Sequence, residues 1–139
     1  MGRTILGAVA GLLVAFFTIM VVEFAGHQAY PPPPGLDPMV PADMAMIMQS
    51  MPLGAMLLVV VAWLTGAFDG GFVAALVARG NRPRVAAVVP ALLVMAGVVG
   101  MVVQLPGHPL WMSIAGLLLP IPVALAGAGL ASRRKPAAR

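Results

Sequence analysis

The chain has 139 residues, of which 61% are hydrophobic and 9% are charged, and its mean hydropathy is +1.03. A water-soluble domain of this length must present more polar surface, so the composition excludes a soluble protein and indicates a lipid environment. The net charge of +4 comes from short basic flanks without interleaved aromatic residues, which argues against nucleic acid, and the absence of cysteine excludes disulfides and thiolate metal sites.

Four long apolar stretches follow one another along the chain. Each exceeds the roughly 20 residues that a helix needs to cross a hydrocarbon core. Backbone groups in that core have no water to bind, so helices are the expected form. The sequence therefore predicts an all-α, single-domain, polytopic membrane protein, a bundle of four transmembrane helices. The predicted spans are 5–26, 52–78, 85–105 and 109–131.

The basic residues predict the orientation of these spans. They are Arg3, Arg79, Arg82, Arg84, Arg133, Arg134, Lys135 and Arg139. All fall on one side of a four-span topology, in the N-terminal flank, the second connection and the tail 132–139. Short basic segments stay in the cytoplasm, so we expect an N-in/C-in protein. The style of the composition suggests the inner membrane of a bacterium as its location.

The first span begins after Arg3, and its apolar run is longer than that of a typical secretory signal, so we expect a retained anchor. At its outer end Glu23 and His27 lie four residues apart and share one face of a helix. His108 lies in the other outer connection. Two histidines and a carboxylate are a candidate site for Zn²⁺ or Cu²⁺, and the alternative is that Glu23 and His27 pair with each other or with headgroup water.

The segment 27–51 is predicted to be extracytoplasmic and rich in proline and methionine. Its prolines favour an extended chain, and Asp43 is the expected N-cap of a short helix over 44–50. Its methionines are Met39, Met44, Met46, Met48 and Met51. Thioether sulfur is a soft ligand that suits Cu(I), while methionine is also an adaptable apolar residue that can rest on the bilayer surface. Both interpretations stay open at this point.

The second span contains Asp69, about 13 Å from its cytoplasmic end at a rise of about 1.5 Å per residue. A carboxylate at that depth is costly, so Asp69 should face the bundle in protonated form. Thr65, four residues earlier, is the predicted hydrogen-bond partner, and Thr18 of the first span reaches a similar depth. An acid in the membrane is a candidate proton or cation site, but it can also simply hold two helices together.

Small residues and prolines predict how the helices pack. Pairs four residues apart place two small side chains on one helix face, where two backbones can approach closely. These pairs are Gly7 and Gly11, Gly66 and Gly70, and Gly127 and Ala131. Pro90 in the third span and Pro120 with Pro122 in the fourth are expected to kink those helices.

Four short motifs follow one another along the chain. They are Gly35-Leu36-Asp37-Pro38, Met51-Pro52-Leu53-Gly54-Ala55, Gly66-Ala67-Phe68-Asp69-Gly70-Gly71 and Pro106-Gly107-His108-Pro109-Leu110-Trp111. Over most of its length the chain resembles small four-helix membrane proteins of bacteria that have no assigned activity. The resemblance implies the same fold and topology, and it implies no activity.

The chain holds no nucleophile elbow, phosphate-binding loop or zinc-protease helix, so we expect no enzyme. The sequence favours a non-enzymatic structural or accessory component of a membrane assembly, without a cofactor. Its expected partners are the lipid bilayer and either further copies of itself or a larger membrane complex. The alternatives are a small proton- or cation-coupled transporter or channel that uses Asp69, and extracytoplasmic handling of copper or zinc.

Overall fold

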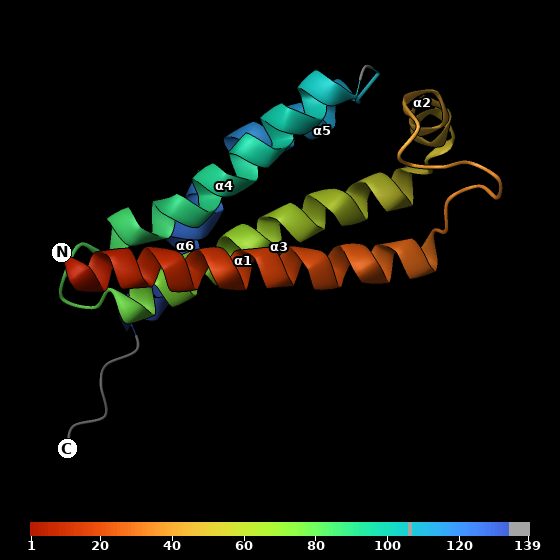
Figure 1. The fold of residues 1–139 in the computed structure, drawn as a ribbon. Helices are drawn as coiled ribbons and strands as arrows, with labels where there is room; N and C mark the ends of the chain where they lie inside the picture. Colours follow the sequence, from red (N-terminus) through yellow and green to blue (C-terminus); the bar gives the residue numbers. More distant parts are fainter. Residues whose placement is uncertain (106, 134–139) are drawn as a thin grey trace.

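The computed structural model describes residues 1–105 and 107–133, and this part of the chain is helical throughout apart from its connections (Figure 1). The helices are α1 (Gly2–Ala29), α2 (Pro41–Ser50), α3 (Leu53–Val77), α4 (Pro83–Gln104), α5 (Leu110–Leu118) and α6 (Pro120–Arg133). Four helical stretches are long and apolar enough to cross a membrane: α1, α3, α4, and α5 with α6 taken together. The prediction of an all-α fold with four helical stretches long and apolar enough to cross a membrane is confirmed.

The last span is interrupted at Pro120, as its prolines predict. Helix α5 ends at Leu118, and α6 begins at Pro120. Proline has no amide hydrogen, so Pro120 cannot continue the hydrogen-bond ladder of α5. Pro122 lies in the first turn of α6, where a helix leaves its amide groups without intrahelical partners in any case. Pro90, by contrast, lies inside α4, which continues past it.

Helix α3 is the centre of the bundle, since it packs against α1, α4, α5 and α6. Its closest neighbour is α1, and small residues allow the contact. A Cβ atom built on Gly11 would lie 2.5 Å from the Gly70 carbonyl oxygen, and one built on Gly7 would lie 2.6 Å from that of Ala74. The packing role predicted for these glycines is confirmed.

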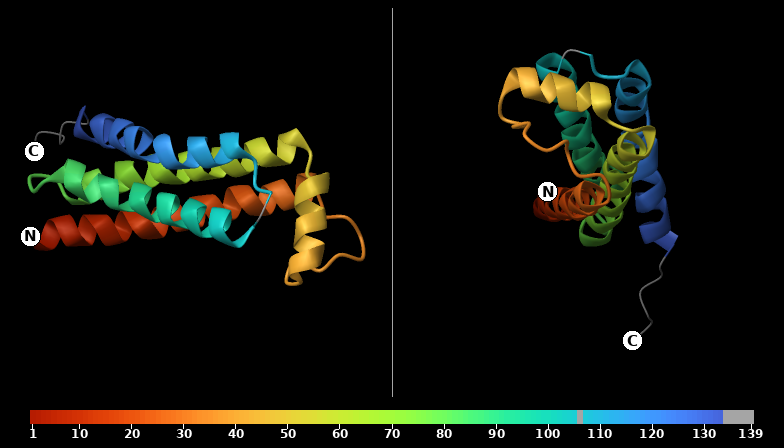
Figure 2. Two further views of the ribbon diagram at one scale, coloured as in Figure 1. Left: turned by 90° about the horizontal axis from the view of Figure 1, so that it is seen from above. Right: turned by 90° about the vertical axis from the view of Figure 1, so that its right-hand side faces the viewer.

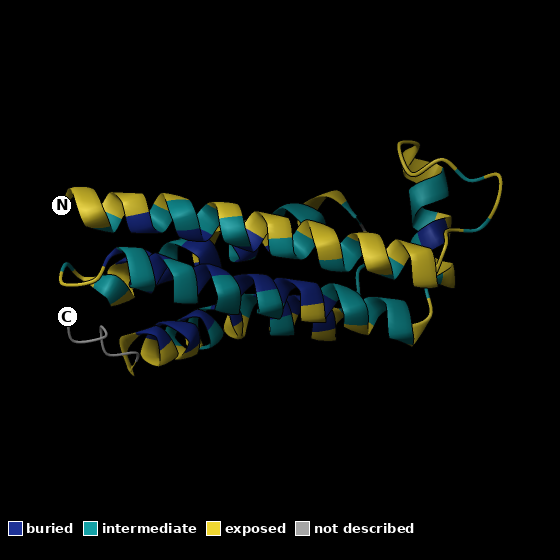
Figure 3. Ribbon diagram, turned by 90° about the horizontal axis from the view of Figure 1, so that it is seen from below, coloured by how far each residue is buried: buried dark blue, intermediate teal, exposed yellow. Residues whose placement is uncertain are grey.

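Large apolar residues lie on the outside of the bundle, many of them on α1, much of whose ribbon is coloured as exposed in Figure 3. Phe17 is 64% exposed and Phe24 is 68% exposed, although both are aromatic. The buried residues of α3 are mostly glycine and alanine instead. Large apolar side chains outside and small residues inside suit hydrocarbon rather than water, which is compatible with a multi-pass integral membrane protein.

The two ends of the bundle differ. The start of α1, the turn between α3 and α4, and the end of α6 lie together at one end, whereas α2 crosses the other (Figures 1 and 2). The Thr4 hydroxyl ties α1 to the turn by donating to the Asn81 carbonyl oxygen at 2.7 Å. The described basic residues are all in these segments, at the end opposite α2. Arg134, Lys135 and Arg139 lie outside the described residues.

Candidate functional site

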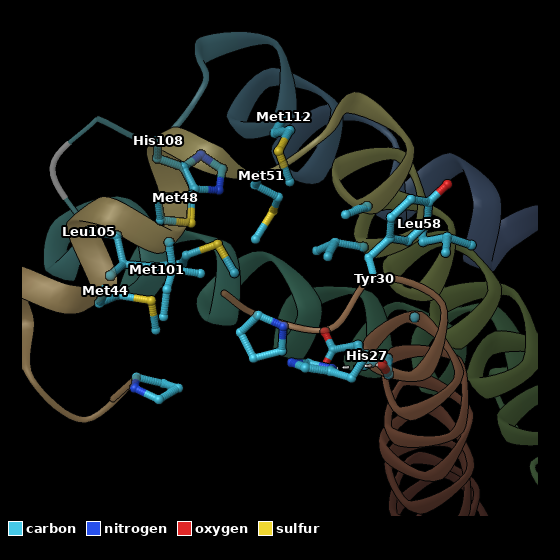
Figure 4. A pocket seen from close by; sticks show the side chains of 17 residues that line it. His27, Tyr30, Met44, Met48, Met51, Leu58, Met101, Leu105, His108 and Met112 are labelled. Carbon is cyan, nitrogen blue, oxygen red and sulfur yellow. Dashed lines mark hydrogen bonds between the residues drawn. The ribbon is translucent and has the colours of Figure 1, made fainter. Parts of the chain in front are cut away.

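A pocket of about 280 Å³ lies between α2 and the ends of the spanning helices (Figure 4). Among the described helices, α2 has no close backbone packing against another, so side chains fill part of the space beneath it and leave the rest open. The lining residues come from α1, α2, α3, α4 and α5 as well as the connections between them. All the outer-face residues that the sequence singled out for metal binding border this pocket except Met39 and Met46.

Helix α2 begins earlier than predicted, so the prediction of Asp43 as its N-cap is wrong. The cap position is Val40, and Pro41 occupies the first turn, where its fixed φ angle suits a helix start. Asp43 lies in the first turn, and its carboxylate accepts a hydrogen bond from the backbone N–H of Asp37 at 3.0 Å. The Asp37 carboxylate in turn accepts from the N–H of Met39 at 2.8 Å. These bonds fold the proline-rich segment back onto α2 and fix where that helix starts.

The helical repeat decides which methionines of α2 face the pocket. Met44 and Met48, four residues apart, line it, whereas Met46 does not and is 50% exposed. Met51 follows directly after α2, and it lines the pocket as well. Two further methionines, Met101 of α4 and Met112 of α5, complete the set. Five of the 11 methionines of the chain thus surround one pocket.

His108 reaches the same pocket from the turn between α4 and α5. Gly107 precedes it with φ +95, a backbone conformation that glycine adopts at low cost. The Nδ1 atom of His108 lies 3.2 Å from the hydroxyl oxygen of Ser113, a buried residue of α5. The Nε2 atom is buried, and it is the one buried side-chain nitrogen or oxygen in the described residues that lacks a hydrogen-bond partner.

His27 and Glu23 lie at a different part of the wall. The His27 Nδ1 atom is 2.8 Å from the Glu23 backbone carbonyl oxygen, which can only accept, so Nδ1 carries the proton. The two residues are thus joined by a hydrogen bond from the His27 ring to the Glu23 backbone, and the Glu23 side chain takes no part in it. Figure 4 shows His27 on the side of the pocket away from His108. The described residues contain no group of three or more His, Asp or Glu side chains placed to hold a metal ion, so the predicted set Glu23, His27 and His108 is not formed as a cluster.

Asp69 has a different partner from the predicted one. The Thr18 hydroxyl of α1 donates to the Asp69 carboxylate at 3.3 Å, which joins α1 to α3 in the middle of the bundle. The Thr65 hydroxyl instead donates to the backbone carbonyl oxygens of Val61 at 2.7 Å and Ala62 at 3.1 Å. A threonine inside a helix readily bonds the preceding turn in this way, and this local bond replaces the predicted one.

Sequence reasoning missed Met101, Met112 and Ser113 as parts of the site. The two methionines stand in apolar spans, where they look like any other core residue. Ser113 is a single hydroxyl in the last span, and only the fold brings it next to His108.

Comparisons with protein-family models, with curated proteins and with solved structures give no match to this chain.

Proposed function

We propose that the protein is a non-enzymatic, multi-pass component of the bacterial inner membrane that handles a metal ion at its extracytoplasmic face, as an accessory part of a membrane assembly. The observation that carries this proposal is the buried Nε2 atom of His108, which has no hydrogen-bond partner and borders a pocket rich in methionine. A buried polar atom without a partner is costly, and imidazole nitrogen is a common metal ligand in proteins. Binding a metal would satisfy that atom.

The orientation follows from charge. Arg3, Arg79, Arg82, Arg84 and Arg133 occupy one end of the bundle, and short basic segments stay in the cytoplasm. The pocket lies beneath α2 at the opposite end, so the N-in/C-in topology places it on the extracytoplasmic side. The bilayer contacts the apolar sides of the bundle, which leaves the α2 end for a metal donor, a metal acceptor or another protein of the assembly.

Asp69 supports packing rather than transport. Its bond from Thr18 joins two helices that are already in close contact through glycines. An interhelical hydrogen bond of this kind satisfies a polar group in the membrane without any ion. The competing function, a proton- or cation-coupled transporter or channel, requires Asp69 to exchange a proton or ion during a cycle.

The proposal is tested by metal content. The full chain is purified in mild detergent from cells grown with added copper and zinc, and its metals are measured by mass spectrometry. Wild type should retain metal, and replacement of both His27 and His108 by Gln should remove it. Replacement of Met46 by Leu, on the exposed side of α2, should leave the metal content unchanged. Wild-type protein that is folded and free of metal under these conditions would refute metal handling.

A further inference from the structure

We infer that the ion held in this pocket is Cu(I), bound by the Nε2 atom of His108 together with methionine thioethers, foremost those of Met48, Met51 and Met112. This inference rests on the proposed function and names its metal, its oxidation state and its ligands. The side chains of His108, Met48, Met51, Met101 and Met112 converge on one side of the pocket (Figure 4). Met48 belongs to α2, and Met51 is the residue that follows it. Met101 belongs to α4, His108 to the turn between α4 and α5, and Met112 to α5.

The kind of donor selects the metal. Thioether sulfur is a soft ligand that prefers Cu(I), whereas Zn²⁺ prefers thiolate, imidazole and carboxylate. This side of the pocket offers several thioethers and one imidazole. Carboxylate is represented in the lining by Glu23 alone, next to His27 on the other side of the pocket. The donors that meet at His108 therefore suit Cu(I) better than Zn²⁺.

The charge of the ion also fits its surroundings. Thioether and neutral imidazole ligands carry no charge, so they leave the charge of a bound ion uncompensated. The pocket lies at an apolar membrane boundary, where the cost of an uncompensated charge rises steeply with its size. A monovalent ion is therefore favoured over a divalent one.

Ser113 prepares His108 for this role. In a neutral imidazole one nitrogen carries the proton and the other has a free lone pair. When Nδ1 donates to the Ser113 hydroxyl at 3.2 Å, Nε2 is left with a free lone pair and no hydrogen-bond partner at the wall of the pocket. A hydrogen bond to the distal nitrogen is the usual way in which a protein fixes the tautomer and orientation of a metal-binding histidine. Ser113 is therefore a positioning residue, and it does not bind the ion itself.

Helix α2 gives the ion a route into the pocket. Its backbone packs closely against none of the other described helices, while its Met44 and Met48 side chains face inward. A small displacement of α2 therefore exposes the thioethers to the extracytoplasmic side without opening the bundle. The three methionines of this segment that line the pocket, including Met51, are then the first donors that an arriving ion meets.

The test is a titration of the metal-free full chain in mild detergent with Cu(I), without oxygen, in competition with a coloured Cu(I) chelator. Wild type should bind an equimolar amount, and X-ray absorption at the copper edge should show sulfur neighbours. Replacing Met48 or Met112 by Leu should weaken binding, and replacing His108 by Leu should weaken it further. The matched control is Met46→Leu, two residues from Met48 on the same helix, which should bind as wild type does.

Ser113→Ala should keep the stoichiometry but lower the affinity by about 10-fold to 100-fold, the usual effect of losing such a hydrogen bond. Circular dichroism and size-exclusion chromatography identify variants that are misfolded. If Met112→Leu is misfolded, Met48→Leu still tests whether thioethers bind Cu(I), because Met48 lies on α2 outside the buried core.

The outcomes separate this inference from the proposed function. Retained Zn²⁺, or Cu²⁺ bound with only nitrogen and oxygen neighbours, would overturn the Cu(I) site while leaving metal handling intact. Cu(I) binding that Met46→Leu weakens as much as Met48→Leu does would also overturn it, since binding would then be spread over the methionine-rich segment. Folded protein that binds neither copper nor zinc would refute both proposals.

Discussion

The close contact between α1 and α3 makes a quantitative prediction about Gly11. A Cβ atom at this position would lie 2.5 Å from the Gly70 carbonyl oxygen, 2.7 Å from the Ala74 Cβ and 2.9 Å from the Pro90 Cγ. Two of these are backbone or Cβ atoms that cannot rotate away. Gly11→Ala therefore forces α1 and α3 apart by about 1 Å, and a gap of that size forfeits a quarter to a half of the dispersion energy of the contacts it opens.

We expect Gly11→Ala to lower the free energy of unfolding by about 1–3 kcal/mol, the range for inserting a methyl group into a filled interior. The matched control is Gly97→Ala in α4, where nothing lies within 4 Å of the added methyl group. Alanine suits a helix interior better than glycine by about 0.5–1 kcal/mol, so this control should be neutral or stabilising. Unfolding in mixed detergent micelles, followed by circular dichroism, gives both values. Equal effects of the two substitutions would refute the close α1–α3 contact.

Three further predictions concern the middle and the two ends of the bundle. Thr18→Val should lower the free energy of unfolding by about 0.6 kcal/mol, a typical value for an interhelical hydrogen bond in a membrane protein, and Thr65→Val should change it less because the Thr65 hydroxyl bonds only its own helix. In liposomes we expect no proton or monovalent-cation flux from wild type or from Asp69→Asn; flux in wild type that Asp69→Asn abolishes would make Asp69 a transport site and contradict its packing role. The chain has no cysteine, so single cysteines can be placed at Gln49 and at Ser132 and treated with an impermeant maleimide in intact cells. We expect the maleimide to label position 49 and not position 132, because the basic end of the bundle faces the cytoplasm. Labelling of position 132 instead would show the opposite topology.

The number and position of the spans could be predicted because a membrane imposes one strong constraint, namely a helix of sufficient length and apolarity for each crossing. The break at Pro120 was equally predictable, since it depends on one residue and its missing amide hydrogen. The start of α2 was not, because two signals compete there. Proline in the first turn and an acidic N-cap both favour a helix start, and Pro41 prevailed over Asp43.

The candidate site could be predicted only in part. The sequence indicated His108 and the methionines of 39–51 separately, but not that they lie together, since no spacing rule connects a loop residue with a helix about 60 residues earlier. The spacing of four residues correctly indicated that Thr65 and Asp69 lie on one face of the same helix. The Thr65 hydroxyl nevertheless bonds its own preceding turn, and Asp69 takes its bond from Thr18 of another helix.

The buried small residues of α1 lie in the half of the helix away from the pocket. Within α1, all of which the structure describes, the buried residues are Gly7, Gly11 and Ala15, in the half that starts from the basic end. There α1 and α3 are in backbone contact. In the other half the larger side chains of Leu58 and Tyr30 line the pocket.

The closest α1–α3 backbone contact, at Gly7 and Gly11, and the methionines of the α2 segment lie in different halves of the molecule. Substitutions at Met48, Met51 and His108 therefore act away from the α1–α3 contact at Gly7 and Gly11. Changes at sites that are far apart and share no partner are expected to be independent. The Met48→Leu and Met51→Leu variants should accordingly lose metal while unfolding at the same denaturant concentration as wild type, and Gly11→Ala should lose stability while the folded fraction still binds Cu(I). If instead each change altered both properties, the pocket and the α1–α3 contact would form a single cooperative unit, and their independence would be refuted.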